Sequence, residues 1–165
     1  MPDDSPDQIF EEFQDIVQQA ILTGFPNPAL RSAIETVTGA DGLIAVTPVF
    51  AAGYSGLFKS FFDVLDVDAL EGKPVLLGAT GGTERHSLVL DYQLRPLFGY
   101  LRAVPVATGV YAASSDWGSG EASGALQRRI ERAARELAGA MSGQTASPSA
   151  GGLVPFEQLL AGAGD

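Results

Sequence analysis

The sequence contains no cysteine and a single histidine, His86. Disulfides, thiolate metal ligands and cysteine nucleophiles are therefore excluded, and so is any site that needs several histidines. No apolar run approaches the roughly 18 residues that a membrane span requires. The first residues, MPDDSPDQ, lack the basic flank and apolar core of a secretory signal. These absences predict a cytoplasmic protein with no membrane partner.

Positive charge is also scarce, because 10 lysines and arginines face 20 aspartates and glutamates, for a net charge of -10. Phosphate binding needs a basic face, so we expect no nucleic-acid partner. One basic cluster lies on a predicted helix, with Glu131 and Glu136 interleaved, and this pattern is typical of a solvated helix face. Its members are Arg128, Arg129, Arg132 and Arg135.

Short apolar runs alternate with helical patterns along the chain. Buried strands are expected at 43–47, 75–80 and 105–111. Helices are expected at 5–23, 27–39, 56–66, 88–101 and 122–141, the second capped by Asn27, opened by Pro28 and stopped by Gly39. This alternation predicts an α/β fold with a parallel sheet. Domains of this kind and length usually have five strands, so we expect a segment to be missing at the start.

We divide the chain into three parts. We expect residues 1–141 to form the α/β domain, and residues 142–152, SGQTASPSAGG, have the composition of a flexible linker. Residues 153–165 carry enough apolar side chains to dock on their own domain or on a neighbour.

Two strand-to-helix loops, TPVFAAGYSG after the first strand and TGGTERHS after the second, carry the candidate site. Both should emerge at the carboxyl edge of the sheet, where open α/β sheets bind ligands. Glycines there let backbone approach a flat ligand, and exposed N–H groups can bond a heteroaromatic ring. The candidate residues are Thr47, Pro48, Val49, Phe50, Ala51, Tyr54, Ser55, Thr80, Gly81, Gly82, Thr83, Arg85 and His86. Phe50 and Tyr54 could equally be packing residues, and Arg85 could equally be an exposed helix-start arginine.

The linked motifs TPVF (47–50), YSGLFKSFFD (54–63), LEGKP (70–74) and TGG (80–82) resemble the NADPH-dependent FMN reductases. The segments LTGFPNPALR, TGGTERHSL and PFEQLL are similar to the branch that serves luciferase-like monooxygenases. The resemblance implies a flavodoxin-like three-layer sandwich with a parallel sheet. It also implies FMN and NADPH or NADH as cofactors, hydride transfer by positioning without a catalytic acid or base, and a homodimer or homotetramer.

The resemblance fails at the start of the chain, where the family has a first strand and a loop that holds the FMN phosphate. We therefore expect an N-terminally truncated version of the fold. Two alternatives stay open. One is an NAD(P)H:quinone or azo reductase on the same scaffold, and the other is a non-catalytic domain that does not retain FMN and folds by oligomerising.

Overall fold

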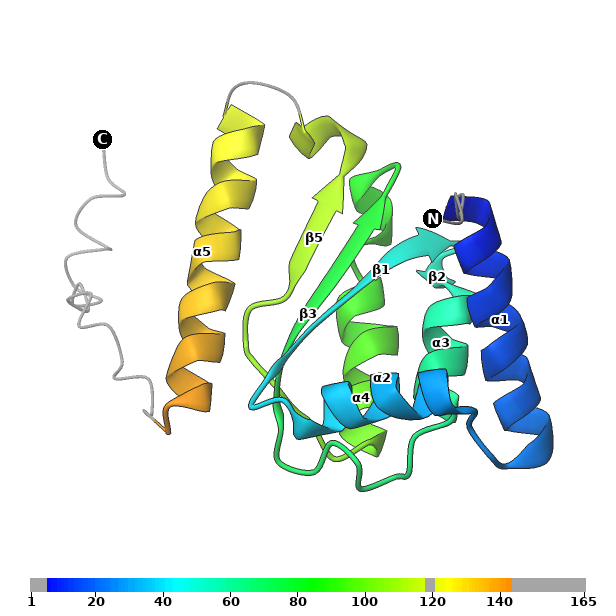
Figure 1. The fold of residues 1–165 in the computed structure, drawn as a ribbon. Coiled ribbons are helices and arrows are strands. Elements are labelled where there is room, and N and C mark those ends of the chain that lie inside the picture. Colours follow the sequence, from blue (N-terminus) through cyan, green and yellow to red (C-terminus); the bar gives the residue numbers. More distant parts are fainter. Residues whose placement is uncertain (1–5, 118–120, 144–165) are drawn as a thin grey trace, which may run out of the picture.

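The computed structural model describes residues 6–117 and 121–143 (Figure 1). Its helices are α1 (Pro6–Thr23), α2 (Pro28–Gly39), α3 (Gly56–Asp63), α4 (Arg95–Tyr100) and α5 (Glu121–Met141). Short 3₁₀ turns lie at η1 (Glu84–His86) and η3 (Ser114–Trp117), and a π turn, η2 (Leu90–Leu94), leads into α4. The strands are β1 (Leu43–Phe50), β2 (Gly53–Tyr54), β3 (Pro74–Gly81), β4 (Val104–Pro105) and β5 (Val110–Ala113). The expected tail at 153–165, and the expected linker from residue 144 onward, lie outside the described residues.

The sheet is mostly parallel, as predicted. Strand β3 pairs in parallel with β1 on one side and with β4 and β5 on the other, whereas β2 pairs antiparallel with β1. Helix α5 covers one face of the sheet, and α3 and α4 cover the other, which gives three layers (Figure 1). Helix α2 begins as expected, because the Asn27 side chain accepts a hydrogen bond of 2.9 Å from the Leu30 N–H. None of the described helices is long and apolar enough to cross a membrane.

The expected end of the first strand at Thr47–Pro48 is wrong, because β1 continues through Pro48 to Phe50. Phe50 pairs with Gly53 across a two-residue turn, so its backbone groups point toward β2 and away from β3. The backbone groups of successive residues in a strand point to alternate sides, so those of Pro48, two residues before Phe50, also point away from β3. The missing N–H of Pro48 therefore removes no hydrogen bond from the β1–β3 ladder.

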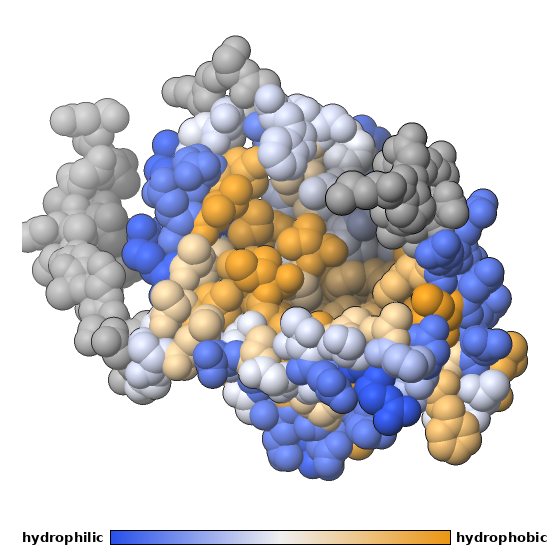
Figure 2. Space-filling view, viewed as in Figure 1, coloured by the Kyte–Doolittle hydropathy of each residue, from blue (hydrophilic) through white to orange (hydrophobic). Residues whose placement is uncertain are grey.

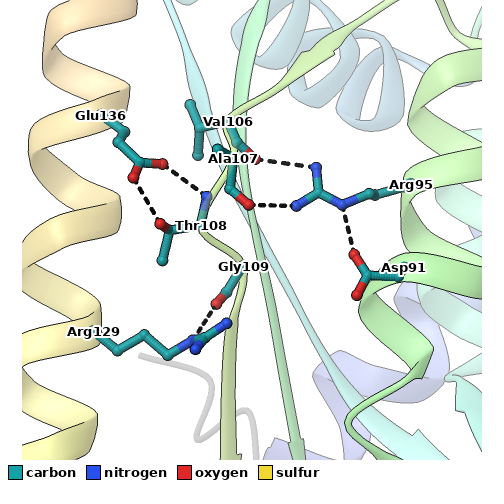
Figure 3. A network of polar contacts seen from close by, with 8 residues as sticks. All are labelled: Asp91, Arg95, Val106, Ala107, Thr108, Gly109, Arg129 and Glu136. Carbon is teal, nitrogen blue, oxygen red and sulfur yellow. Dashed lines mark hydrogen bonds and ion pairs between the residues drawn. The ribbon is translucent and has the colours of Figure 1, made fainter. Parts of the chain in front are cut away.

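The expected third strand is interrupted. The register runs from Val75↔Pro105 to Gly78↔Val110, so the outer strand carries two extra residues between β4 and β5. Side chains from both helical layers bind the backbone of this insertion (Figure 3). Arg95 donates to the carbonyl oxygens of Val106 and Ala107 at 3.1 and 2.6 Å.

From the opposite layer, the Glu136 carboxylate accepts from the Thr108 N–H and hydroxyl at 2.7 and 2.6 Å. Arg129 donates to the Gly109 carbonyl oxygen at 2.7 Å (Figure 3). The prediction of a solvated face for this part of α5 is therefore wrong at Glu136, which is half-buried, whereas Arg129 is exposed and bonds the insertion from the surface. The side chains of Arg129 and Glu136 bond to the backbone here because an interrupted strand leaves N–H and C=O groups without partners in the sheet.

The main core lies between the sheet and the α3–α4 layer. Phe62 is its centre, with ring centroids 4.8 Å from Phe58 and 4.9 Å from Phe98. On this side β1 contributes Ala45 and Thr47, which are 7% and 0% exposed. Helix α1 joins the layer through α3, where Phe13 stacks on Phe61.

The other face of β1 is open, and the expectation of a strand covered on both faces is wrong within the described residues. Ile44, Val46 and Phe50 are 65%, 54% and 64% exposed, and Pro48 between them is also exposed. These four residues, hereafter the β1 stripe, face the same side because strand side chains alternate. Figure 2 shows apolar surface gathered in a hollow between α5 and α1.

Candidate functional site

The two predicted loops lie side by side at the carboxyl edge of the sheet. Strands β1 and β3 are parallel neighbours, and their register brings Pro48 opposite Thr80. The turn at Ala51–Ala52 follows β1, and Gly82 and Thr83 follow β3. The edge expected from the sequence is therefore the one that the fold builds.

Thr47 holds the first loop in place from the core side of β1. It is fully buried, and its hydroxyl accepts a hydrogen bond of 3.0 Å from the Ser55 N–H. Ser55 in turn caps α3, because its hydroxyl accepts from the Phe58 N–H at 3.1 Å. Both predicted residues thus tie the end of β1 to the start of α3. Thr47 faces the core, so we assign it a positioning role.

The turn between β1 and β2 is strained. Ala51 and Ala52 have φ angles of 48° and 64°, in the left-handed region that non-glycine residues avoid. Gln93 holds the turn by donating to the Ala52 carbonyl oxygen at 3.1 Å. A Cβ at Gly53 would lie 2.8 Å from the Gln93 amide oxygen, so the close approach predicted at this glycine is to Gln93. Strain of this kind persists where surrounding structure holds it and is frequent at binding sites.

The glycine pair after β3 divides into two roles. A Cβ at Gly81 would lie 2.3 Å from the Tyr111 hydroxyl, which donates to the Thr83 carbonyl oxygen at 2.7 Å. Gly82, in contrast, has no atom within 4 Å of an added Cβ. Gly81 therefore makes room for Tyr111, and Gly82 is the glycine whose open side a ligand can approach.

Tyr111 keeps its proton in this arrangement. Burial raises the pKa of its phenol, and the carboxylates of Glu84 and Asp116 raise that pKa further. The phenol consequently remains a hydrogen-bond donor to the loop at neutral pH. Tyr111 gave no sign in the sequence, because its partner Thr83 is far away along the chain, in the loop that follows β3.

Arg85 and His86 lie on η1, directly after Thr83, whose hydroxyl accepts from the Arg85 N–H at 3.4 Å. Both line a shallow pocket of about 390 Å³ that also includes Ala52. The other lining residues are Leu88, Val89, Tyr92 and Gln93. Arg85 of the second loop and Ala52 of the strained turn therefore line one pocket.

Other predicted residues line a separate apolar hollow of about 510 Å³. Pro48, Phe50 and Ser55 meet Phe13 of α1 there. Leu57, Phe58, Phe61 and Phe62 complete the lining. Val49 and Tyr54 are a cross-strand pair that packs on the main core, so packing accounts for both. Phe13 was missed because it belongs to the helical stripe of α1, which gives no sign of a site.

The chemistry of these loops is that of binding. Among residues 6–117 and 121–143, no group of three or more His, Asp or Glu side chains could hold a metal ion. The open backbone at Gly82, the exposed ring of Phe50 and the cation of Arg85 fit a flat, polar-edged ring such as a flavin. Gly82 leaves room for a ligand because its surroundings are open and it lies on the loop that follows β3.

Comparison with known proteins agrees with this geometry. A family profile described as NADPH-dependent FMN reductase matches residues 8–118. An FMN reductase (NADPH) from Pseudomonas aeruginosa is 44% identical over 117 residues, which cover 70% of this chain and 63% of the relative. An NADH-dependent FMN reductase, SfnF, from Pseudomonas fluorescens is 46% identical and covers 66% of this chain and 59% of its own. The chain spans less than two thirds of the length of these curated relatives.

A solved structure of an oxidoreductase from Corynebacterium diphtheriae superposes with a TM-score of 0.76 at 47% identity, over 82% of this chain and 74% of that one. An apo structure of an NADH:FMN oxidoreductase, EmoB, gives a TM-score of 0.61 at 33% identity, over 80% of this chain and 69% of that one. The fold and the family profile lead to the same assignment. The chain belongs to the NADPH-dependent FMN reductase family.

Proposed function

We propose that the protein reduces FMN with NAD(P)H and passes the reduced flavin to a luciferase-like monooxygenase. The observation that carries the proposal is the open backbone at Gly82, beside the strained Ala51–Ala52 turn, in a chain of this family. A flavin ring fits between two such loops because their backbone can come close to it.

The role of the protein is to position the reactants. FMN, when bound, supplies the hydride acceptor for the nicotinamide. The Thr47–Ser55 hydrogen bond and the Gln93–Ala52 hydrogen bond fix the first loop, and Tyr111 fixes the second. Preorganised loops of this kind lower the barrier by holding the reacting atoms in line. Hydride transfer needs no side-chain acid or base, so no residue is assigned that task.

Arg85 is the cation of the site. We propose that it binds the 2′-phosphate of NADPH, because it lies on the loop rim and lines the pocket beside Ala52. A nearby cation also stabilises negative charge that reduction leaves on the flavin ring. His86 lines the same pocket and contacts the bound nucleotide in this proposal.

We further propose that the protein acts as a homodimer or homotetramer. Tyr92 and Tyr100 are 75% and 70% exposed and line one groove between α3 and α4. Exposed aromatic side chains gathered in a groove are typical of subunit contacts. We also propose that the protein is cytoplasmic, because the reaction consumes NAD(P)H, a nucleotide of the cell interior.

The test is an absorbance scan of the protein after it is mixed with FMN and desalted, followed by addition of NADPH. A retained flavin band that bleaches with NADPH supports the proposal. Gly82→Val fills the open side without touching protein, so it should weaken FMN binding at least tenfold. Gly39→Val is the matched control, because Gly39 has equally open surroundings at the far end of α2.

The same assay separates the alternatives. Bleaching that is faster with a quinone or an azo dye as final acceptor would favour a reductase for those substrates. A protein that retains no FMN and shows no NADPH oxidation would overturn the proposed activity for this chain.

A further inference from the structure

A pocket of about 580 Å³ lies between helix α5 and the outer edge of β5. Three of its lining residues are arginines of α5, namely Arg128, Arg129 and Arg132. The chain has 10 lysines and arginines against 20 acidic residues, so three cations in one pocket contrast with the charge of the whole molecule. The rest of the lining comes from β5, the segment before it, η3 and α5 itself. The pocket is therefore separate from the β1 stripe and from both loops of the candidate site.

The arginines keep donors available for a ligand. Among the side chains that the structure describes, no carboxylate forms an ion pair with Arg128 or Arg132. Arg129 donates through Nε to the Gly109 carbonyl oxygen at 2.7 Å (Figure 3). Its two terminal nitrogens make no hydrogen bond to a described residue, so the pocket has three guanidinium groups with unused N–H donors.

The carboxylates near the pocket already have hydrogen-bond partners. Asp116 lines the pocket and accepts from the Ala113 N–H at 2.8 Å. Glu136 lies next to the pocket, where it accepts two hydrogen bonds from Thr108. The lining thus carries three positive charges against one negative charge, and it favours an anionic ligand.

The edge of β5 adds a backbone donor. The Ala113 N–H bonds the Asp116 side chain, so it points away from β3. Residues two apart in a strand direct their backbone groups to the same side, so the Tyr111 N–H also points outward. Tyr111 lines the pocket at this edge, while its hydroxyl bonds Thr83. Guanidinium groups together with a backbone N–H form a donor set that suits an oxyanion.

The pocket is also larger than an inorganic ion requires. Its volume falls within the range of pockets that hold small organic molecules. Ala125 and the half-buried Leu126 contribute an apolar wall on α5. An organic group can therefore occupy the space beside the arginines.

We propose that this pocket binds a small organic anion through a phosphate or carboxylate group. Arg128, Arg132 and the Tyr111 N–H hold that group, since arginine bonds both kinds of oxyanion in a bidentate manner. The carbon part of the ligand lies against Ala125 and Leu126. The site includes neither loop of the flavin site, so it does not depend on the proposed activity.

The single tryptophan, Trp117, directly follows Asp116 and provides a signal for binding. Trp117 fluorescence of the full chain is titrated with phenyl phosphate and, separately, with benzoate. A saturable change is expected with at least one of them, and the tighter ligand identifies the preferred oxyanion. Benzyl alcohol, which lacks the charge, should give no change. Inorganic phosphate, which lacks the ring, should bind more weakly than phenyl phosphate.

Substitutions then locate the bound anion. The double variant R128Q with R132Q should weaken binding roughly tenfold or more, because two charge-assisted contacts are lost. R135Q is the matched control, because Arg135 lies on the same helix outside the pocket lining. R85Q should also leave the affinity unchanged, since Arg85 belongs to the loop after β3. Thermal unfolding gives a second readout, because a bound ligand raises Tm.

Several results would overturn the proposal. One is equal affinity of the parent protein and the R128Q/R132Q variant. Another is weaker binding in R85Q alone, which would place the anion at the flavin loops. The absence of both a fluorescence change and a rise in Tm with every probe would have the same meaning. Equal affinity for phenyl phosphate and inorganic phosphate would contradict an organic ligand.

Discussion

The Tyr111 hydroxyl donates a 2.7 Å hydrogen bond to the Thr83 carbonyl oxygen, directly above Gly81. This contact joins β5 to the loop that follows β3, and it requires a residue without a side chain at position 81. The binding loop is thus held by a tyrosine that does not itself need to touch a ligand.

Tyr111→Phe should lower the free energy of unfolding at neutral pH by about 1 kcal/mol, because one partly buried hydrogen bond is lost. The raised pKa of Tyr111 means that the folded state holds the phenolic proton more tightly than the unfolded chain, in which the pKa is 10.0. Its contribution is full below pH 10 and is lost as the pH rises toward the folded-state pKa.

Denaturant unfolding between pH 8 and 11 would check this sign. The parent protein should lose stability above pH 10 more steeply than Y111F. Identical alkaline slopes would show that Tyr111 carries no part of the effect. Absorbance of tyrosinate should meanwhile show a late-titrating component that Y111F lacks.

Replacing Ala51–Ala52 by Asn-Gly should stabilise the protein. The two alanines lie at positive φ in a two-residue turn, where Asn-Gly is preferred. Relief of left-handed strain is worth about 1–2 kcal/mol per residue. Thermal unfolding would measure the gain, and Ser-Ser at the same positions should give none, since serine shares the strain of alanine.

Glu136→Ala should be the most damaging change on α5. It removes the acceptor of two bonds from Thr108, which lies in the two-residue insertion. Loss of hydrogen bonds to a charged group costs about 1.5–3 kcal/mol. Glu131→Ala is the control on the same helix, where the side chain is exposed and bonds only Gln127, and we expect a change below about 0.5 kcal/mol.

Arg85→Gln should lower kcat/KM for NADPH about tenfold and that for NADH less than twofold, since one charge-assisted bond to the 2′-phosphate contributes roughly 1.4 kcal/mol or more. Arg31→Gln, on exposed α2, should change neither value. An equal loss with both nucleotides would instead assign Arg85 to the reduced flavin. Unchanged kinetics would make it a surface residue.

The parallel α/β arrangement and the pairing of the two loops were predictable, because each depends on local pattern. Buried strands ended by glycine-rich turns, and the Asn27–Pro28 helix start, are encoded in a few neighbouring residues. The loops then meet because carboxyl ends of parallel strands share one edge. These elements were predictable because residues close together in the sequence determine them.

The remaining features depend on partners distant in sequence. Pro48 reads as the end of a strand until the direction of its backbone groups in the sheet is known. The roles of Gly81, Gly53 and Glu136 follow from Tyr111, Gln93 and Thr108, each on another element. Which side chains of β1 are exposed also depends on distant partners, because a continuous apolar run does not specify what packs on each face.

The two-residue insertion makes the two edges of the sheet differ in how accessible their backbone groups are. Between Val106 and Gly109, side chains from the two helical layers bond to carbonyl oxygens that another strand would need. No further strand can pair with this part of the edge while these bonds are in place. Among the described residues, no side chain bonds to the backbone of Ile44 or Val46 at the opposite edge. A strand added next to residues 106–109 would first have to displace Arg95 and Arg129, so these two side chains define where the sheet stops.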